Sequence, residues 1–158
     1  MNKRDKVRQY YNEHFQDEDE RLNYHSFELP LTMRFIHQYL PENARIFDTA
    51  CGTGHYAEHL LKEGMVVGLN DLSDKNIQHV RAEFGNSKSI LFSDCGDIME
   101  SRRWDEYQWD AILILGPMYH LVSLENRMKL LRRASESVKP AGLVFTSFMT
   151  RTGALVHG

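Results

Sequence analysis

From residue 45 onward, short apolar runs alternate with amphipathic stretches along the chain. The apolar runs predict five strands, at residues 45–49, 65–70, 89–93, 110–115 and 143–149. The stretches between them predict helices at about residues 54–63, 73–84 and 123–138, and a weak, polar helix somewhere in 97–107. Strands that alternate with helices form parallel sheets with right-handed crossovers. We therefore expect an α/β fold with a doubly wound parallel sheet.

The first 40 residues lack this alternation, and we expect residues 1–40 to form a helical region ahead of an α/β domain at residues 41–158. One helix is predicted at residues 3–15 by side chains that share one side, namely Val7, Tyr10, Tyr11, His14 and Phe15. A second helix is predicted from about Pro30 to the residue before Pro41. The first, aromatic helix is expected either to close over a ligand as a lid or to pack as an ordinary helix.

The composition indicates which classes of molecule the protein is expected to bind. With 158 residues, of which 42% are hydrophobic, the chain is long enough to form one domain with its own core. A formal net charge of −3 and the lack of a basic block predict no nucleic-acid partner. Charged residues interrupt every apolar run, and the N-terminus lacks the apolar segment of a secretion signal. With only two cysteines, Cys51 and Cys95, the sequence predicts a cytoplasmic protein with reduced thiols and without a membrane partner.

The stretch from Arg45 to Gly54 carries the first candidate chemistry. It reads as a strand that ends in Asp48, a turn that begins at Gly52, and the start of a helix. Such a turn brings bare backbone N–H groups and a helix N-terminus against a ligand at the carboxyl end of the sheet. Gly52-x-Gly54-x-x-Ala57 fits the dinucleotide fingerprint, but the carboxylate before it would repel a pyrophosphate. The same carboxylate would attract a ligand that carries an ammonium or sulfonium group.

The longer spacing of this stretch, D-x-x-x-G-x-G, resembles motif I of the class I S-adenosylmethionine-dependent methyltransferases. Residues 66–73 (V-V-G-L-N-D-L-S) resemble the family's second strand, and residues 93–98 (S-D-C-G-D-I) resemble its G-D-A-x-D-L segment. Residues 109–121 resemble the fourth strand and turn of a subgroup written F-D-x-V-L-x-L-G-P-L-Y-H-L. Residues 138–142 resemble the L-K-P-G-G turn, from which Ala141 departs. The resemblance covers about residues 41 to 150.

This resemblance implies a Rossmann-like sheet with strand order 3-2-1-4-5 that lacks the last two strands of the family. It further implies S-adenosyl-L-methionine as the cofactor and methyl transfer to a nucleophile on a small molecule. The cofactor-binding residues that it implies are Asp48, Ala50, Cys51, Gly52, Gly54, Asn70, Asp71, Leu72, Asp94, Cys95 and Leu115.

Three carboxylates take different parts of the cofactor by the same resemblance. Asp48 and the glycine turn hold the methionine part. Asp71 holds the ribose hydroxyls, with Asn70 as the alternative because the register of this motif is ambiguous. Asp94 takes the adenine amino group, with Asp97 as the alternative if the register of the third motif slips.

Tyr119 and His120 follow the strand whose end faces the transferred methyl group in this family, and they are the candidate catalytic residues. We expect them either to contact the acceptor, with His120 taking its proton, or to pack the turn. His55 and His59 are spaced i, i+4 on a helix but lack an evident third ligand, so no metal is predicted. The two cysteines are expected to line the cofactor rather than to act as nucleophiles.

The chain ends soon after the fifth strand, whereas the family continues into a helix and a hairpin that complete the sheet. Residues 144–149 are therefore expected to be an unpaired edge, which favours self-association or marks the chain as part of a longer protein. Two functions besides the enzyme stay open. One is a cofactor-binding module or truncated methyltransferase without turnover, and the other is an NAD-dependent dehydrogenase, which Asp48 disfavours.

Overall fold

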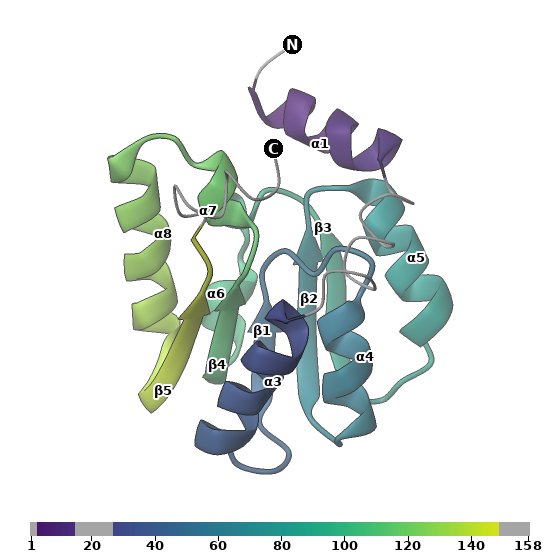
Figure 1. The fold of residues 1–158 in the computed structure, drawn as a ribbon, viewed down its shortest axis with the longest axis vertical. Coiled ribbons are helices and arrows are strands. Elements are labelled where there is room, and N and C mark those ends of the chain that lie inside the picture. The colour runs from purple at the N-terminus through teal and green to yellow at the C-terminus, as the bar shows by residue number, and fades with distance from the viewer. Residues whose placement is uncertain (1–2, 15–26, 149–158) are drawn as a thin grey trace.

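A five-stranded parallel sheet lies at the centre of the computed structural model, which describes residues 3–14 and 27–148 (Figure 1). The strands are β1 (Arg45–Asp48), β2 (Val66–Asp71), β3 (Ile90–Cys95), β4 (Trp109–Ile114) and β5 (Val138–Thr146). Their order is β3-β2-β1-β4-β5, and all neighbours are parallel. The predicted Rossmann-like sheet and its strand order are confirmed. Within the described ranges, no sixth strand follows β5.

Helices cover both faces of this sheet (Figure 1). One face carries α3 (Glu28–Tyr39), α4 (His55–Lys62) and α5 (Asp74–Phe84). The other carries a 3-10 turn, η1 (Ile98–Glu100), with α6 (Arg103–Glu106) and α8 (Leu124–Ser137). The helix α1 (Lys3–Glu13) lies beyond the carboxyl ends of the strands, and the short α7 (Pro117–His120) follows β4 there. None of the helices in the described part of the chain is long and apolar enough to cross a membrane.

Some elements differ from the predicted ones. The weak helix expected somewhere in residues 97–107 is confirmed in part as the short α6, whereas the segment before α6 is a 3-10 turn in which the Asp97 carboxylate accepts the Met99 N–H at 2.9 Å. The fifth strand was expected at residues 143–149 but begins at Val138, directly after α8. The sequence pattern also missed α7. The helix α3 begins slightly earlier than expected, with Pro30 in its first turn, where a missing N–H costs nothing.

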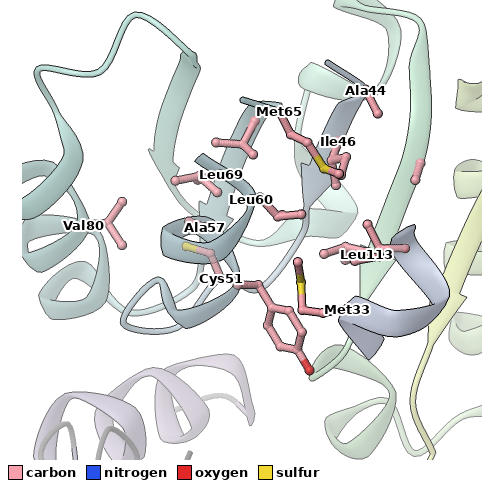
Figure 2. Close-up of a cluster of buried hydrophobic side chains, with 14 of the residues drawn as sticks. Met33, Ala44, Ile46, Cys51, Ala57, Leu60, Met65, Leu69, Val80 and Leu113 are labelled. Carbon is pink, nitrogen blue, oxygen red and sulfur yellow. The ribbon is translucent and has the colours of Figure 1, made fainter. Parts of the chain in front are cut away.

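Apolar side chains from three helices cover one face of the sheet. Figure 2 shows this cluster, to which Met33, Leu60, Ile46 and Leu113 contribute from α3, α4, β1 and β4. These side chains are at most 6% exposed. Full burial of one such side chain contributes roughly 1.5–3 kcal/mol, so this face anchors the loops that follow β1 and β2.

Aromatic rings fill the opposite face. Phe47 stacks on Trp109 with ring centroids 5.0 Å apart and meets Trp104 edge to face at 5.2 Å. Gly68 lies beneath this cluster, where a Cβ atom would come within 2.5 Å of the Phe92 ring and 2.8 Å of Trp109. The glycine in the V-V-G-L sequence of β2 therefore leaves room for the aromatic layer.

The turn that leads into the paired part of β5 contains a strained residue. Trp109 pairs with Val138 but Ala111 pairs with Leu143, so residues 139–142 loop out of the register. Ala141 has φ of 65° in this loop, in the left-handed region that favours glycine. This is the position at which the sequence departs from the L-K-P-G-G pattern.

Candidate functional site

Asp48 closes β1 and is buried, with 1% of its surface exposed. Its Oδ1 accepts the Ala50 N–H at 3.3 Å, whereas its Oδ2 has no hydrogen-bond partner among the described residues. Burial raises the pKa of this carboxyl to about 7; the Ala50 N–H opposes the shift, and the nearby charge of Asp71 adds to it. A cation placed at Oδ2 would favour the ionised form and supply the missing partner.

The glycine turn follows immediately. Gly52 and Gly54 have φ of 55° and 94°, and a Cβ on Gly54 would lie 2.8 Å from the Phe84 ring. A Cβ on Gly52 would meet nothing within 4 Å, so the space above the turn is open. The Thr53 hydroxyl between them is buried without a hydrogen-bond partner in the part of the chain that the structure describes. Sequence reasoning missed Thr53, although its place between two glycines was a usable signal.

Asp71 ends β2 and joins the loops that follow β1 and β2. Its Oδ2 accepts the Gly52 N–H at 2.9 Å, and its Oδ1 accepts the Ser73 N–H at 2.8 Å and the Asn76 side-chain amide at 3.1 Å. Burial raises the pKa of Asp71, and these hydrogen bonds oppose the shift. The Leu72 N–H also favours the ionised carboxylate, so donors from the loops after β1 and β2 hold Asp71 in place.

Asn70 also lies in this corner of the molecule. Its side-chain amide donates to the Gly96 carbonyl at 3.1 Å and to the Thr49 carbonyl at 3.3 Å. It thereby connects the loops after β1 and β3. The Asn70 carbonyl accepts the Cys51 N–H at 2.9 Å, which fixes the backbone of the predicted Cys51 position.

The end of β3 carries the predicted adenine residues. Asp94 is half-exposed and pairs with Arg103, whose Nε lies 2.7 Å from Oδ2. Cys95 is exposed, and its thiol donates weakly to the Leu72 carbonyl at 3.7 Å. Asp97, the alternative to Asp94, caps the 3-10 turn and pairs with Arg4 at 2.6 Å.

The residues after β4 lie at the same carboxyl edge of the sheet. Leu115 is half-buried, and its carbonyl accepts the Ser147 hydroxyl at 2.8 Å; Ser147 in turn accepts the Tyr119 hydroxyl at 2.7 Å. The Nε2 atom of His120 lies 2.8 Å from the hydroxyl of Tyr11 in α1. Tyr119 and His120 therefore have different hydrogen-bond partners. Ala50 lies beside the same loop, 3.6 Å from where a Cβ of Gly116 would be.

The helix α1 is bound to the loops after β2, β3 and β4. The Arg8 Nε donates to the Leu72 carbonyl at 3.1 Å, and Asn12 bonds both Asp74 (2.8 Å) and the Ser73 hydroxyl (2.6 Å). Sequence reasoning chose the aromatic side of this helix and missed its polar one, in which Arg4, Arg8 and Asn12 repeat every four residues. Tyr10 is 47% exposed and stacks on His14, outside these contacts. Phe15 lies outside the described residues.

The two thiols differ in exposure, and burial favours the protonated form of each. Burial is the main cause that raises the pKa of Cys51 well above its usual range and the pKa of Cys95 to a smaller extent. Within the described ranges, no group of three His, Cys, Asp or Glu side chains is placed to hold a metal ion. His55 and His59 both lie on α4.

Comparison with known sequences adds to this geometry. Residues 46–142 match the model of a family described as a methyltransferase domain. The chain is 30% identical over 112 residues to the YqeM protein of Bacillus subtilis (strain 168), covering 70% of this chain and 44% of that protein. It is 26% identical over 123 residues to a ubiquinone biosynthesis O-methyltransferase of Hydrogenovibrio crunogenus, covering 77% of this chain and 50% of the relative. The chain thus spans about half the length of the curated relatives that it matches.

Solved structures share the fold. A TehB-like SAM-dependent methyltransferase from Corynebacterium glutamicum superposes with a TM-score of 0.72 at 20% identity, covering 91% of this chain and 76% of that one. The DhpI–SAM–HEP complex superposes with a TM-score of 0.63 at 20% identity, covering 94% and 67%. At this level of identity the agreement shows the fold, and it extends over nearly the whole chain.

Proposed function

Because the chain belongs to the methyltransferase domain family, whose cofactor is S-adenosylmethionine, we propose that it transfers a methyl group from this cofactor to a nucleophile on a small molecule. The observation that carries the proposal is the buried Asp48 carboxylate, whose Oδ2 has no hydrogen-bond partner among the described residues. It lies directly before the open glycine turn. The ionised carboxylate would repel the phosphates of a dinucleotide, whereas it would attract the ammonium group of a ligand.

The side chains at the sheet edge fit the cofactor from one end to the other. Asp48 suits the ammonium group of the methionine part, since the cation would stabilise the ionised carboxylate. Asp71 suits the ribose, because a carboxylate accepts hydrogen bonds from hydroxyl groups and this one is held at the carboxyl end of β2. We keep Asn70 as a support of the loops, because its amide already bonds two backbone carbonyls. Asp94 suits the adenine amino group, which is a donor.

The bound cofactor would supply a methyl group on a sulfonium, from which a neutral thioether is a good leaving group, so the protein needs little acid–base chemistry. The main contribution of the chain is to hold the acceptor close to the cofactor in a site that excludes water. His120 is the proposed proton acceptor, since a neutral imidazole can take the proton of an oxygen nucleophile. Its Nε2 is already within 2.8 Å of one hydroxyl, that of Tyr11, which is the distance a proton transfer requires.

A neutral hydroxyl compound is the proposed class of acceptor. The candidate catalytic residues Tyr119 and His120, and the Tyr11 side chain that meets His120, offer hydroxyl and imidazole groups rather than fixed charges. One relative is named as an O-methyltransferase of ubiquinone biosynthesis, which agrees with an oxygen nucleophile. We further propose that the protein acts in the cytoplasm without nucleic-acid or membrane partners, and that the exposed edge of β5 pairs with a second copy.

Turnover is tested by measuring the release of S-adenosylhomocysteine with a panel of phenols, alcohols and amines. We expect release with at least one phenol or alcohol, and His120→Ala should lower the rate by roughly 100-fold or more, the range of general base catalysis. The matched control is His59→Ala on α4, which should retain the rate. Cofactor binding without release for any acceptor would favour the alternative of a binding module, and binding of NAD instead would favour the dehydrogenase.

A further inference from the structure

Arg103 holds the Asp94 carboxylate from one side. Its Nε lies 2.7 Å from Oδ2 of Asp94, and its second amino group lies 3.5 Å from Oδ1. The guanidinium also pairs with Glu106, and its Cζ lies 4.5 Å from the centroid of the Phe92 ring. The planar group is thus fixed by two carboxylates and an aromatic face, a geometry that arginine forms and lysine does not.

The backbone at Arg103 is also well anchored. The neighbouring Trp104 is 1% exposed, and its indole N–H donates to the Ile98 carbonyl at 2.9 Å. The Arg103 N–H donates to the Ser101 hydroxyl at 3.2 Å. Because α6 is held by a buried indole, the guanidinium projects from a fixed point toward the end of β3.

Asp94 needs such support. It lies on the edge strand β3, and 38% of its side chain is exposed, so nothing buries the carboxylate into one orientation. Half-exposed ion pairs contribute little to folding, so the consequence of this pair is geometric rather than a matter of stability. With Arg103 on one side, the lone pairs that remain on the carboxylate are left for a ligand that donates hydrogen bonds.

Resting on the proposed function, we propose that Arg103 is a positioning residue that fixes Asp94 for the amino group of the cofactor's adenine. An ionised carboxylate only accepts hydrogen bonds, so it selects a base that donates at this position. Adenine carries an amino group there and hypoxanthine carries a carbonyl oxygen, which the carboxylate repels. Arg103 therefore sets how strongly the site prefers adenine to hypoxanthine.

The test is calorimetry of the purified chain with S-adenosylhomocysteine and with S-inosylhomocysteine, in which a carbonyl oxygen replaces the amino group of the base and the adjacent ring nitrogen carries a hydrogen. We expect the wild type to prefer the adenine compound by about 100-fold, since a site built around one hydrogen bond rejects the analogue that cannot form it. Arg103→Gln should weaken binding of the adenine compound by about 5- to 30-fold and reduce the preference to below about 10-fold. Arg103→Lys should have an affinity and a preference between those of the wild type and Arg103→Gln. If Arg103→Gln does not fold, Arg103→Lys is compared with the wild type instead.

The matched control is Arg102→Gln, which removes an exposed arginine one residue away and should leave both affinities unchanged. In an Asp94→Asn background, Arg103→Gln should have no further effect, because it acts through the carboxylate. Equal weakening of both ligands, or an unchanged preference, would overturn the proposal. If the wild type binds neither ligand, the proposed function itself is overturned, and this proposal with it; the two failures are thus distinguishable.

Discussion

Asp48→Asn is expected to stabilise the ligand-free domain at pH 8 and to destabilise it at pH 5. The carboxyl has a pKa of about 7 in the folded state against 3.8 in the unfolded state. Between these values the folded state binds the additional proton, so the free energy of unfolding falls as the pH rises. A pKa that moves from 3.8 to about 7 corresponds to a loss of about 4 kcal/mol that is complete above about pH 8.

The asparagine variant removes this loss but introduces a smaller one. Its side-chain amino group would be buried at the position where Oδ2 has no hydrogen-bond partner among the described residues, at a cost of about 1–3 kcal/mol. The net gain at pH 8 is therefore about 1–3 kcal/mol, or roughly 3–8 °C in melting temperature. At pH 5 the wild-type carboxyl is protonated, so only the cost remains and the sign reverses.

Urea denaturation of both proteins at pH 5 and pH 8 measures this difference. The control is Asp105→Asn, since Asp105 is exposed and pairs with Arg133 at the surface, where no change of sign is expected. Affinity for S-adenosylhomocysteine should fall by roughly 10- to 100-fold in Asp48→Asn, because the ammonium group loses its charged partner. A wild-type protein of constant stability from pH 5 to pH 8, or a variant that is less stable at both, would refute the reasoning.

Three other substitutions or conditions test the fold. Gly54→Ala should lower the free energy of unfolding by roughly 2–4 kcal/mol, from its positive φ and the contact with Phe84, whereas Gly96→Ala, which meets open space, should change it by less than about 0.5 kcal/mol; chemical denaturation compares them. Ala141→Gly should raise the free energy of unfolding by about 0.5–1 kcal/mol, and with it the melting temperature, because φ of 65° strains alanine. An unchanged or lower melting temperature would contradict the assigned strain. Among the described residues no strand pairs with the outer edge of β5, which predicts self-association, and a monodisperse monomer in light scattering well above micromolar concentration would count against it.

The sheet was predictable from the sequence because its strands are short apolar runs with clear ends. The run at residues 110–115 is β4 within one residue, and its burial on both faces explains why it lacks alternation. The position of the helix within residues 97–107 was not predictable, since the Asp97 cap starts a 3-10 turn and only the residues around the buried Trp104 form α6. Local sequence patterns do not reveal where the 3-10 turn ends and the helix begins.

The site was predictable only in part, for a similar reason. Asp48 and the glycine turn are contiguous, so their chemistry could be read from one stretch. The bond from the Gly52 N–H to Asp71 joins two segments, and the ion pair of Arg103 with Asp94 depends on the position of the short α6, which the sequence pattern did not locate. The polar side of α1 was also missed, because its partners lie in loops more than sixty residues away.

The central claim is that this sheet edge binds a cationic cofactor without phosphate, and calorimetry with S-adenosylhomocysteine and NAD tests it most directly. The two ligands share an adenosine, so the comparison isolates what lies beside Asp48 and the glycine turn. We predict that the chain binds S-adenosylhomocysteine, that NAD does not compete, and that Asp48→Asn weakens the binding. Binding of NAD without binding of S-adenosylhomocysteine would contradict the account.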